Sequence, residues 1–354
     1  MNSSHAQSAS PPVTNATPAE VAARLLAARR IMLTTHAKPD GDAIGSVLAL
    51  ARACRAAGSD AAIFLKGPIP GPMRAFLGPN PIIELAETPP DDAFDLIVVC
   101  DTGAKSQLEP LGEWLAARSA KVIVLDHHTQ VDPIAETRIV ETRYAAAAQL
   151  VLEVVERMKV PISGGPFGIA EAVFLGLATD TGWFRFVNAD AAVFRAASRL
   201  LEAGADKDRI FALSEENAQP TRLALTARAL ASIEMLAGGR AALMTLTPED
   251  FRTTGGGPEE LTGIVNEPMT IGSVLVSILV TSVEENVTKV SLRSKAPVDL
   301  GDGMRPGIDV NRLAGQFGGG GHFHAAGARI REPLAAARKR VVDAVLRTLE
   351  STQG

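Results

Sequence analysis

The sequence has few of the features that mark secreted or membrane-bound proteins. Only two cysteines, Cys54 and Cys100, occur in 354 residues, and both lie in apolar stretches. We expect them to be buried free thiols in a reducing compartment, not a disulfide. The longest apolar run, 271–283, is interrupted by glycine, serine and threonine and is too short to span a bilayer. These absences predict a cytoplasmic protein with no membrane partner.

The chain also has no excess of positive charge. Its formal net charge is −5, which argues against a general binder of long duplex DNA, because such proteins present a basic face. A pocket for a short anionic ligand is not excluded. The first 18 residues are rich in serine, alanine, proline and asparagine and contain no apolar core. They predict a disordered tail and not a signal peptide.

What the sequence does contain is enough apolar residues for a globular α/β protein. Hydrophobic residues make up 46% of the chain, and its length is too great for one core, so two domains are expected. In the front half, short apolar stretches alternate with helical ones, which predicts a parallel sheet covered by helices. We expect these strands at 31–35, 61–65, 96–100 and 122–125.

The predicted organisation has four parts. They are a tail at 1–18, a catalytic α/β domain at 19–188, a helical connector at 189–236 and a smaller α/β domain at 237–354. The last part is expected to contain strands at 241–246, 273–281 and 287–292 and helices at 310–317 and 333–349.

Three clusters of histidine and aspartate follow apolar strands, at 36–42, 101–103 and 126–128. A bare carboxylate or imidazole beside a buried strand is costly unless a charge pairs with it. The carboxyl ends of parallel strands open onto one crevice, so the clusters can converge there on a pair of divalent metal ions. Each cluster also has a plainer reading: a Pro-Asp-Gly turn, a helix N-cap at Asp101, and two incidental histidines.

Within these clusters the spacing suggests separate roles. Asp40 and Asp42 flank Gly41, which permits a tight backbone and lets both carboxylates approach one point. Neighbouring side chains on a strand point to opposite faces, so one of His127 and His128 can bind a metal while the other reaches the substrate. A further carboxylate, Asp180, follows an apolar helix and can complete a metal site, or can belong to a turn.

The predicted second domain carries a glycine run that ends in a histidine, Gly318-Gly319-Gly320-Gly321-His322. Consecutive glycines let the backbone approach an anion and offer N–H groups to it, although a flexible loop is the plainer reading. Arg293, Ser294 and Lys295 end a predicted strand, which suits contact with phosphate or, equally, with solvent.

Taken together, these motifs resemble the DHH/DHHA1 phosphoesterase family. His-x-x-x-Asp-x-Asp, Asp-Thr-Gly, Asp-His-His and Thr-Asp-Thr-Gly occur in the family's order, and the glycine run followed by Ala-Ala-Gly is similar to the signature of the DHHA1 domain. The resemblance covers about residues 20–350. Chain length and the Ser-Leu-Arg-Ser-Lys segment resemble the branch that acts as nano-RNase and 3′,5′-bisphosphonucleotide (pAp) phosphatase.

The resemblance implies two Mn²⁺ ions, with Mg²⁺ or Co²⁺ as the alternatives. It assigns one ion to His36 and Asp40, the other to Asp42, His127 and Asp180, and a bridging position to Asp101. It places His128 at the scissile phosphate or leaving group, with Asp126 orienting the histidines. It gives substrate binding to Arg293, Ser294, Gly319, Gly320, Gly321 and His322. One departure is the four alanines and Gln149 after Tyr144, where the family has a small hydroxyl residue and often glutamate.

We therefore expect a two-domain α/β hydrolase with its active site between the lobes. Its predicted substrates are short single-stranded RNA, dinucleotides and nucleoside bisphosphates, which it would convert to mononucleotides. The alternatives are a phosphodiesterase for cyclic or linear dinucleotides and, in a different class, a nucleotide-binding regulatory module without turnover. The sequence leaves the oligomeric state open, and a homodimer is one of the states it allows.

Overall fold

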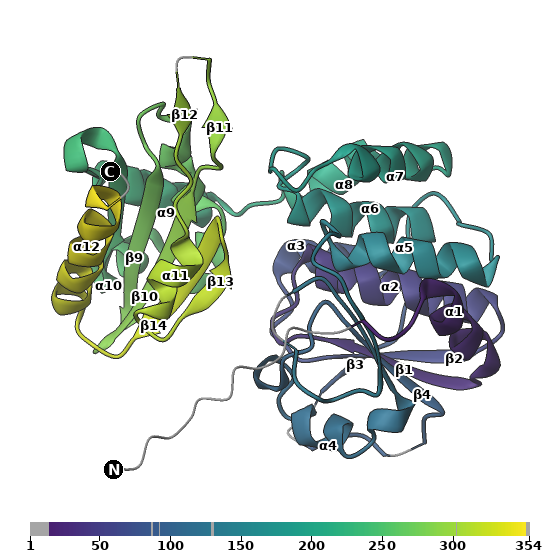
Figure 1. Cartoon of the computed structure of the whole chain (residues 1–354). Coiled ribbons are helices and arrows are strands. Elements are labelled where there is room, and N and C mark those ends of the chain that lie inside the picture. The colour runs from purple at the N-terminus through teal and green to yellow at the C-terminus, as the bar shows by residue number, and fades with distance from the viewer. Residues whose placement is uncertain (1–13, 86–87, 92, 129–130, 302, 352–354) are drawn as a thin grey trace, which may run out of the picture. The chain divides into compact units, whose positions relative to one another are not determined.

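The computed structural model describes residues 14–85, 88–91, 93–128, 131–301 and 303–351. The chain divides into two compact units, Met1–Asn217 and Ala218–Gly354. Both are α/β units, as predicted, and each is built around its own six-stranded sheet (Figure 1). Among the described residues, none of the helices has both the length and the apolar character needed to cross a membrane.

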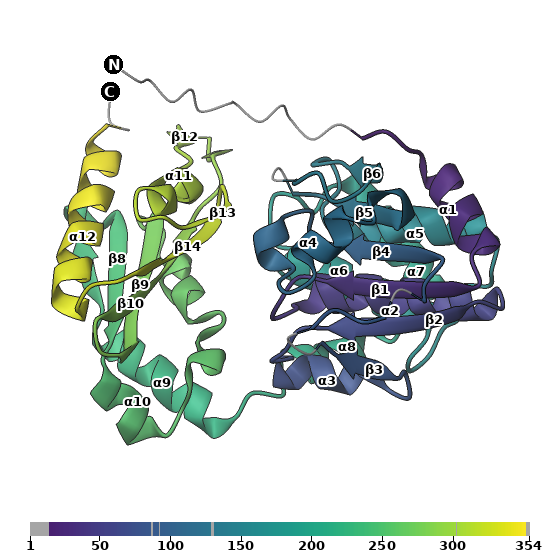
Figure 2. The ribbon, with the colours of Figure 1, turned by 90° about the horizontal axis from the view of Figure 1, so that it is seen from below.

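The sheet of the N-terminal unit is entirely parallel and has the order β3-β2-β1-β4-β5-β6, which Figure 2 shows from edge to edge. The chain order reverses between β1 and β4, and ligands of open parallel sheets bind at such a switch point. The strands are β1 Arg30–Thr35, β2 Asp60–Leu65, β3 Ile82–Glu84, β4 Leu96–Cys100, β5 Val122–Asp126 and β6 Thr137–Val140.

Helices cover both faces of this sheet, because successive strand residues point to opposite sides. Ile31 and Leu33 of β1 belong to the core under α1, α2, α5 and α6, while Met32 belongs to the core on the side of α4 (Figure 1). The helices are α1 Pro18–Ala27, α2 Gly41–Ala56, α3 Gly71–Leu77, α4 Gly112–Ala116, α5 Ala147–Met158, α6 Ile169–Asp180, α7 Ala191–Glu202 and α8 Lys207–Ser214, with 3₁₀ turns η1 Lys105–Gln107 and η2 Ser119–Lys121.

The C-terminal unit has a mixed sheet with the order β13-β14-β10-β9-β8-β7, in which only β8 and β9 run parallel. Helices α11 and α12 pack on one face and α9, α10 and η5 on the other. The strands are β7 Glu234–Leu236, β8 Ala241–Leu246, β9 Val276–Glu284, β10 Val287–Ser294, β13 Gly320–His322 and β14 Ala325–Ile330, with a separate pair, β11 Val298–Asp299 and β12 Met304–Arg305. The helices are α9 Pro220–Ala231, α10 Pro248–Thr254, α11 Val310–Gly315 and α12 Leu334–Glu350, with 3₁₀ turns η3 Ala237–Gly239, η4 Pro258–Leu261 and η5 Ile264–Thr270.

Two predicted segments differ from the structure. Residues 1–13 of the predicted tail lie outside the described residues, but its last part is ordered. Thr14 exchanges hydrogen bonds with the backbone of Val140 on β6, and Thr17 caps α1. The division between the units falls inside the predicted connector 189–236. Helices α7 and α8 belong to the first unit and α9 to the second, because each buries its apolar face in the nearer core.

Candidate functional site

The three predicted clusters meet at the carboxyl edge of the parallel sheet. His36 directly follows β1, Asp101 directly follows β4, and Asp126 is the last residue of β5. Since β4 pairs with both β1 and β5, these positions are neighbours across three adjacent strands. The pairing of β1, β4 and β5 is therefore enough to bring the three motifs close together in space.

Asp101 lies at the centre of the cluster. Its Oδ2 is 3.4 Å from Nε2 of His36, and its Oδ1 is 3.3 Å from Nε2 of His127. The residue is 3% exposed, and its Oδ1 accepts no well-formed hydrogen bond from the described residues. Its φ of 61° lies in the left-handed region, a strained conformation that clusters at functional sites. The N-cap reading does not apply, since the next helical turn, η1, follows Ala104.

Asp40 has two roles in the structure. It is the N-cap of α2, because its Oδ1 accepts hydrogen bonds from the backbone N–H groups of Asp42 and Ala43, both at 3.1 Å. The same Oδ1 lies 3.9 Å from Nε2 of His36. The Nδ1 of His36 lies 3.0 Å from the carbonyl oxygen of Ala37, which can only accept. Nδ1 therefore carries a proton, and Nε2 is directed at the carboxylates of the cluster.

Asp42 is fully buried in the first turn of α2. Its carboxylate accepts the backbone N–H groups of Ala147, at 2.6 Å, and Ala148, at 2.8 Å. These are the first residues of α5, whose N-cap, Ala146, has no capping side chain of its own. Asp42 therefore satisfies the orphan donors of a distant helix.

Asp126 holds the two histidines that follow it in different orientations. Its Oδ1 accepts from the backbone N–H of His127 at 2.8 Å and contacts Nδ1 of His128 at 2.8 Å. The Nδ1 of His127 instead lies 3.2 Å from the carbonyl oxygen of Tyr144, which directs its Nε2 to within 3.3 Å of Oδ2 of Asp180. The two rings nevertheless lie side by side, with centroids 4.5 Å apart, and both approach Oδ1 of Asp101, His127 at 3.3 Å and His128 at 3.7 Å. The division of roles between His127 and His128 therefore remains a prediction.

Electrostatics show that the cluster concentrates negative charge. Burial and the charge of Asp101 raise the pKa of Asp42 to about 7. Burial, together with Asp42 and Asp101, holds the pKa of Asp180 well above its usual range. Burial alone would lower the pKa of His127, but its 3.3 Å contact with Asp101 and the charges of Asp42 and Asp180 raise that pKa to about 10. The cluster therefore stabilises positive charge, either a proton on His127 or a bound cation.

This donor set fits divalent cations. Among the described residues, three groups have ligand atoms that all lie within 4.8 Å of one another, and each combines imidazole nitrogen with carboxylate oxygen, a mixture that suits first-row divalent ions. The groups are His36-Asp40-Asp101, Asp42-His127-Asp180 and Asp101-His127-His128. A cation would also engage the Oδ1 of Asp101, which accepts no well-formed hydrogen bond.

The structure adds supporting residues that the sequence motifs do not include. A Cβ on Gly176 of α6 would lie 2.7 Å from Oδ1 of Asp42, so this glycine makes room for the carboxylate. Asn188 donates to the backbone carbonyls of Asp180 and Ala145 and so ties the loop after α6 to the start of α5. A glycine inside the apolar helix was a visible signal. Asn188 has no such signal, because its partners are backbone oxygens.

In the C-terminal unit, the predicted residues separate onto two faces of the sheet. Arg293 of β10 pairs with Ala325 of β14, which pairs with His322 of β13. Paired residues share a face, so Arg293 and His322 flank the small Ala325 on one side. Ser294 points to the other side, where it is 8% exposed and its hydroxyl donates to the carbonyl of Ile308. The side chain of Ser294 is therefore part of the buried interior of the unit and does not lie on the same sheet face as Arg293.

The glycine run is partly an edge strand and only partly a loop. A Cβ on Gly319 would lie 2.1 Å from the carbonyl oxygen of Gly327, and one on Gly321 would lie 2.4 Å from that of Ala325. Gly321 also has a φ of 148°. These two glycines are therefore required by the close approach to β14. Gly320 has no such contact and lies in register with Gly327, beside the face that carries His322.

Comparisons with known proteins agree with this architecture. A profile of the DHH family, N-terminal domain, matches residues 30–177, and a DHHA1 domain profile matches residues 238–351. The chain is 31% identical to the bifunctional oligoribonuclease and PAP phosphatase NrnA of Thermus thermophilus, over 89% of each protein. It is 27% identical to the protein of the same name from Bacillus subtilis, over 85% of this chain and 89% of that one.

A solved structure is similar over nearly the whole chain. The exopolyphosphatase-related protein from Bacteroides fragilis is 25% identical and superposes with a TM-score of 0.81, covering 94% of this chain and 96% of that one. Both profile matches correspond to the two structural units, and the acid–histidine cluster lies within or just beyond the first match. The chain therefore belongs to the DHH family and joins a DHH N-terminal domain to a DHHA1 domain.

Proposed function

We propose that this chain is a metal-dependent phosphoesterase that hydrolyses short oligoribonucleotides to mononucleotides and converts pAp to AMP. Relatives named bifunctional oligoribonuclease and PAP phosphatase support the substrates. The observation that carries the reaction class is the position of Asp101, whose two carboxylate oxygens face two different His–Asp groups. One carboxylate shared in this way suits a pair of cations acting on one phosphate.

The proposed ligands follow from the grouping of donor atoms. His36 and Asp40 would hold one cation, and Asp42, His127 and Asp180 would hold the other, with Asp101 contributing to both, since these donor atoms lie within 4.8 Å of one another in each group. We propose Mn²⁺ as the ion because the donors are mixed nitrogen and oxygen, and Mg²⁺ and Co²⁺ are the alternatives. When bound, the cations would neutralise charge on the phosphate and lower the pKa of water, so that no strong side-chain base is needed.

The chain's own contribution to the chemistry centres on His128. Its Nδ1 is held 2.8 Å from Oδ1 of Asp126, and its side chain is 36% exposed, so it can reach a substrate. Burial alone would lower the pKa of His128, but its hydrogen bond with Asp126 outweighs that effect and raises the pKa. A protonated His128 is suited to donate a hydrogen bond or a proton to a phosphate oxygen or to the leaving group.

The C-terminal unit is proposed to bind the rest of the nucleotide. Arg293 and His322 offer donors on either side of Ala325, and Gly320 leaves room for a close approach. A site that holds one end of a substrate favours short chains, because longer chains gain no further contacts. The net charge of −5 adds no general attraction for nucleic acid polymers.

One experiment tests the proposal. Purified protein is treated with chelator, reloaded with Mn²⁺, Mg²⁺ or Co²⁺, and assayed for phosphate release from pAp and for mononucleotide release from a ribodinucleotide. We expect both activities to require a divalent ion and to be greatest with Mn²⁺. Nucleotide binding without turnover under all three metals would instead identify a regulatory module. Turnover of cyclic dinucleotides alone would favour the phosphodiesterase alternative.

A further inference from the structure

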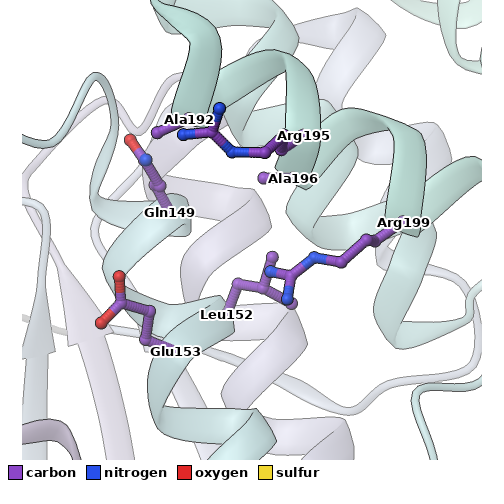
Figure 3. A pocket seen from close by; sticks show the side chains of 7 residues that line it. All are labelled: Gln149, Leu152, Glu153, Ala192, Arg195, Ala196 and Arg199. Carbon is purple, nitrogen blue, oxygen red and sulfur yellow. The ribbon is translucent and has the colours of Figure 1, made fainter.

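A pocket outside the acid–histidine cluster lies between α5 and α7 and has a volume of about 260 Å³ (Figure 3). Glu153 lines it together with Arg195 and Arg199, so its charges are of both signs. The seven residues that line it include no aromatic ring on which a base could stack. The pocket therefore indicates neither an anion nor a nucleobase. The loop 181–190, which joins α6 to α7, has the exposed aromatic surface that this pocket lacks.

Two aromatic side chains fix this loop to the N-terminal unit. The ring of Trp183 lies against that of Phe211 on α8, with centroids 4.8 Å apart. The ring of Phe184 lies 5.6 Å from the rings of both Phe174 on α6 and Phe194 on α7. Trp183 and Phe184 are both half-buried, so their rings contribute to the packing of the unit itself.

The backbone at the start of the loop is strained. Gly182, Trp183 and Phe184 have φ values of 55°, 57° and 61°, in the left-handed region that bulky residues rarely adopt. The backbone N–H of Phe186 donates to the carbonyl oxygen of Thr181 at 3.0 Å and so closes this turn. Strain of this kind persists where the surrounding structure fixes it, and it clusters at functional sites.

Phe186 is the aromatic residue that this loop leaves exposed. It is 47% exposed, and no ring contact joins it to another aromatic residue in the described part of the chain. A Cβ on Gly182 would lie 2.4 to 2.6 Å from three carbon atoms of its ring, so the end of the ring covers this glycine. A single exposed apolar side chain is ordinary on a protein surface, so its position decides what it can do.

The position of Phe186 is next to a proposed metal ligand. Gly182, which its ring covers, follows Asp180 by two residues, so their Cα atoms are at most about 7.6 Å apart. The end of the loop also returns to Asp180, because Asn188 donates to its carbonyl oxygen at 3.2 Å. The side chain of Asp180 is 23% exposed, and its Oδ2 lies 3.3 Å from Nε2 of His127. A phosphate bound at the cluster would therefore have Phe186 within about the length of one nucleoside.

A dinucleotide has a part for which the proposed site supplies no contact. Its scissile phosphate joins the 3′ oxygen of one nucleoside to the 5′ oxygen of the next, whereas the 3′-phosphate of pAp carries no second nucleoside. Arg293 and His322 are proposed to bind the nucleotide that both substrates share. The second nucleoside therefore needs a surface of its own, and an exposed aromatic ring suits it because every base has a face that can stack.

We propose that Phe186 is the stacking surface for the second base of an oligoribonucleotide, the base on the 5′-oxygen side of the scissile phosphate. This inference rests on the proposed phosphoesterase function. Phe186 would then distinguish the two proposed activities, because it contributes to binding of oligoribonucleotides and not to binding of pAp. It would respond to the presence of a base and only weakly to which base it is.

The test compares substrates that differ only in the second nucleoside. Steady-state kinetics are measured for pAp, for the ribodinucleotide pApA and for the same dinucleotide with an abasic second sugar. Phe186→Ala should raise KM for pApA about 5- to 150-fold, the range expected when one base loses its aromatic stacking partner. KM for pAp and for the abasic substrate should stay within about twofold. Phe186→Trp should keep the wild-type KM for pApA, whereas Phe186→Leu should not, because leucine is apolar but has no π face.

Val187→Ala is the matched control, since Val187 is the next residue of the same loop, is 69% exposed and has no ring. It should leave all three KM values unchanged. The metal content of Phe186→Ala, measured by elemental analysis, should equal that of wild type. A rise in KM for pAp as large as that for pApA, or a loss of metal, would show that Phe186 supports Asp180 and that the stacking surface is wrong.

Fluorescence measurements separate this inference from the proposed function. Metal-loaded protein is titrated with a dinucleotide analogue that has 2-aminopurine as its second base and a phosphonate linkage that cannot be hydrolysed. Stacking on Phe186 should change the emission of 2-aminopurine, and Phe186→Ala should abolish that change. This result would support the stacking surface even if no substrate were hydrolysed. Equal emission changes and equal KM ratios in wild type, Phe186→Ala and Val187→Ala would overturn it, whatever the catalytic activity.

Discussion

The two units hold their candidate functional residues in opposite ways. In the N-terminal unit, Asp42, Asp101 and Asp126 are at most 3% exposed, and each is fixed by backbone N–H groups or by histidines of the same cluster. In the C-terminal unit, Arg293 is half-buried and His322 is exposed, and they lie on the same sheet face on either side of the half-buried Ala325. A substitution in the first site should therefore also disturb the residues that share its partners. A substitution in the second site should affect only the contacts of the residue that is replaced.

The largest effect is expected for Asp101→Asn. The change removes one negative charge from the point that faces both His36 and His127, so both proposed cation positions lose neutralisation. We expect turnover to fall below detection and metal content, measured by elemental analysis, to fall at both positions. Asp60→Asn is the control, because its side chain is 75% exposed and only 3.8 Å from Arg30 at the surface. Activity within threefold of wild type with two metals retained would refute the shared-carboxylate arrangement.

The adjacent histidines divide the first site further. His127→Ala should reduce metal content, since Nε2 of His127 faces Asp101 and Asp180. His128→Ala should retain the metals and slow turnover by about 10²- to 10⁴-fold, as for a lost acid–base group. Metal analysis and kcat of both variants decide between these outcomes. Equal loss of metal in both would show that His128 is also a ligand.

A smaller effect is expected at the supporting glycine. Gly176→Ala would place a Cβ 2.7 Å from Asp42 and 2.4 Å from the side chain of Ala148. We expect the free energy of unfolding to fall by about 1–3 kcal/mol, the usual range for overpacking, together with weaker metal binding. Gly315→Ala in α11 meets open space and is the matched helix control. Thermal unfolding with and without metal measures both effects. A Gly176→Ala variant with the stability and metal affinity of wild type would show that the added methyl group does not crowd Asp42.

The smallest effects are expected in the C-terminal unit, and they test whether that site is local. Arg293→Ala or His322→Ala should raise KM for pAp and dinucleotides by about 10- to 100-fold. Metal content and turnover of a small activated phosphodiester should remain unchanged. Ser294→Ala should instead lower stability by about 1 kcal/mol, because it breaks the buried hydrogen bond to Ile308, and should leave KM alone. A KM change in Ser294→Ala as large as that in Arg293→Ala would refute the separation by face.

Much of the N-terminal site was predictable because it depends on local signals in a regular sheet. The strands at 31–35, 96–100 and 122–125 were expected within one residue of their observed bounds. Once they pair in parallel, their carboxyl ends must share one edge, which brings His36, Asp101 and Asp126 together. The assignment of these residues to particular cations remains a prediction.

Other features depend on contacts between residues far apart in the chain. Asp42 caps α5 from a distance of more than 100 residues, and Gly176 is small because that carboxylate lies against it. The glycine run was interpreted as an anion-binding loop, but Gly319 and Gly321 are required by β14. Arg293 and Ser294 are adjacent in sequence, yet the alternation of a strand places them on opposite faces.

The sequence by itself determined the class of the fold, the order of the motifs and the identity of the charged residues at the strand ends. It could do so because hydrophobic periodicity and residue chemistry are local properties. The tertiary structure decided which carboxylates became neighbours, which glycines were steric necessities, and where one unit ends and the next begins. Those outcomes are set by packing, since each helix buries its apolar face in whichever core lies within reach, and no local pattern records that choice.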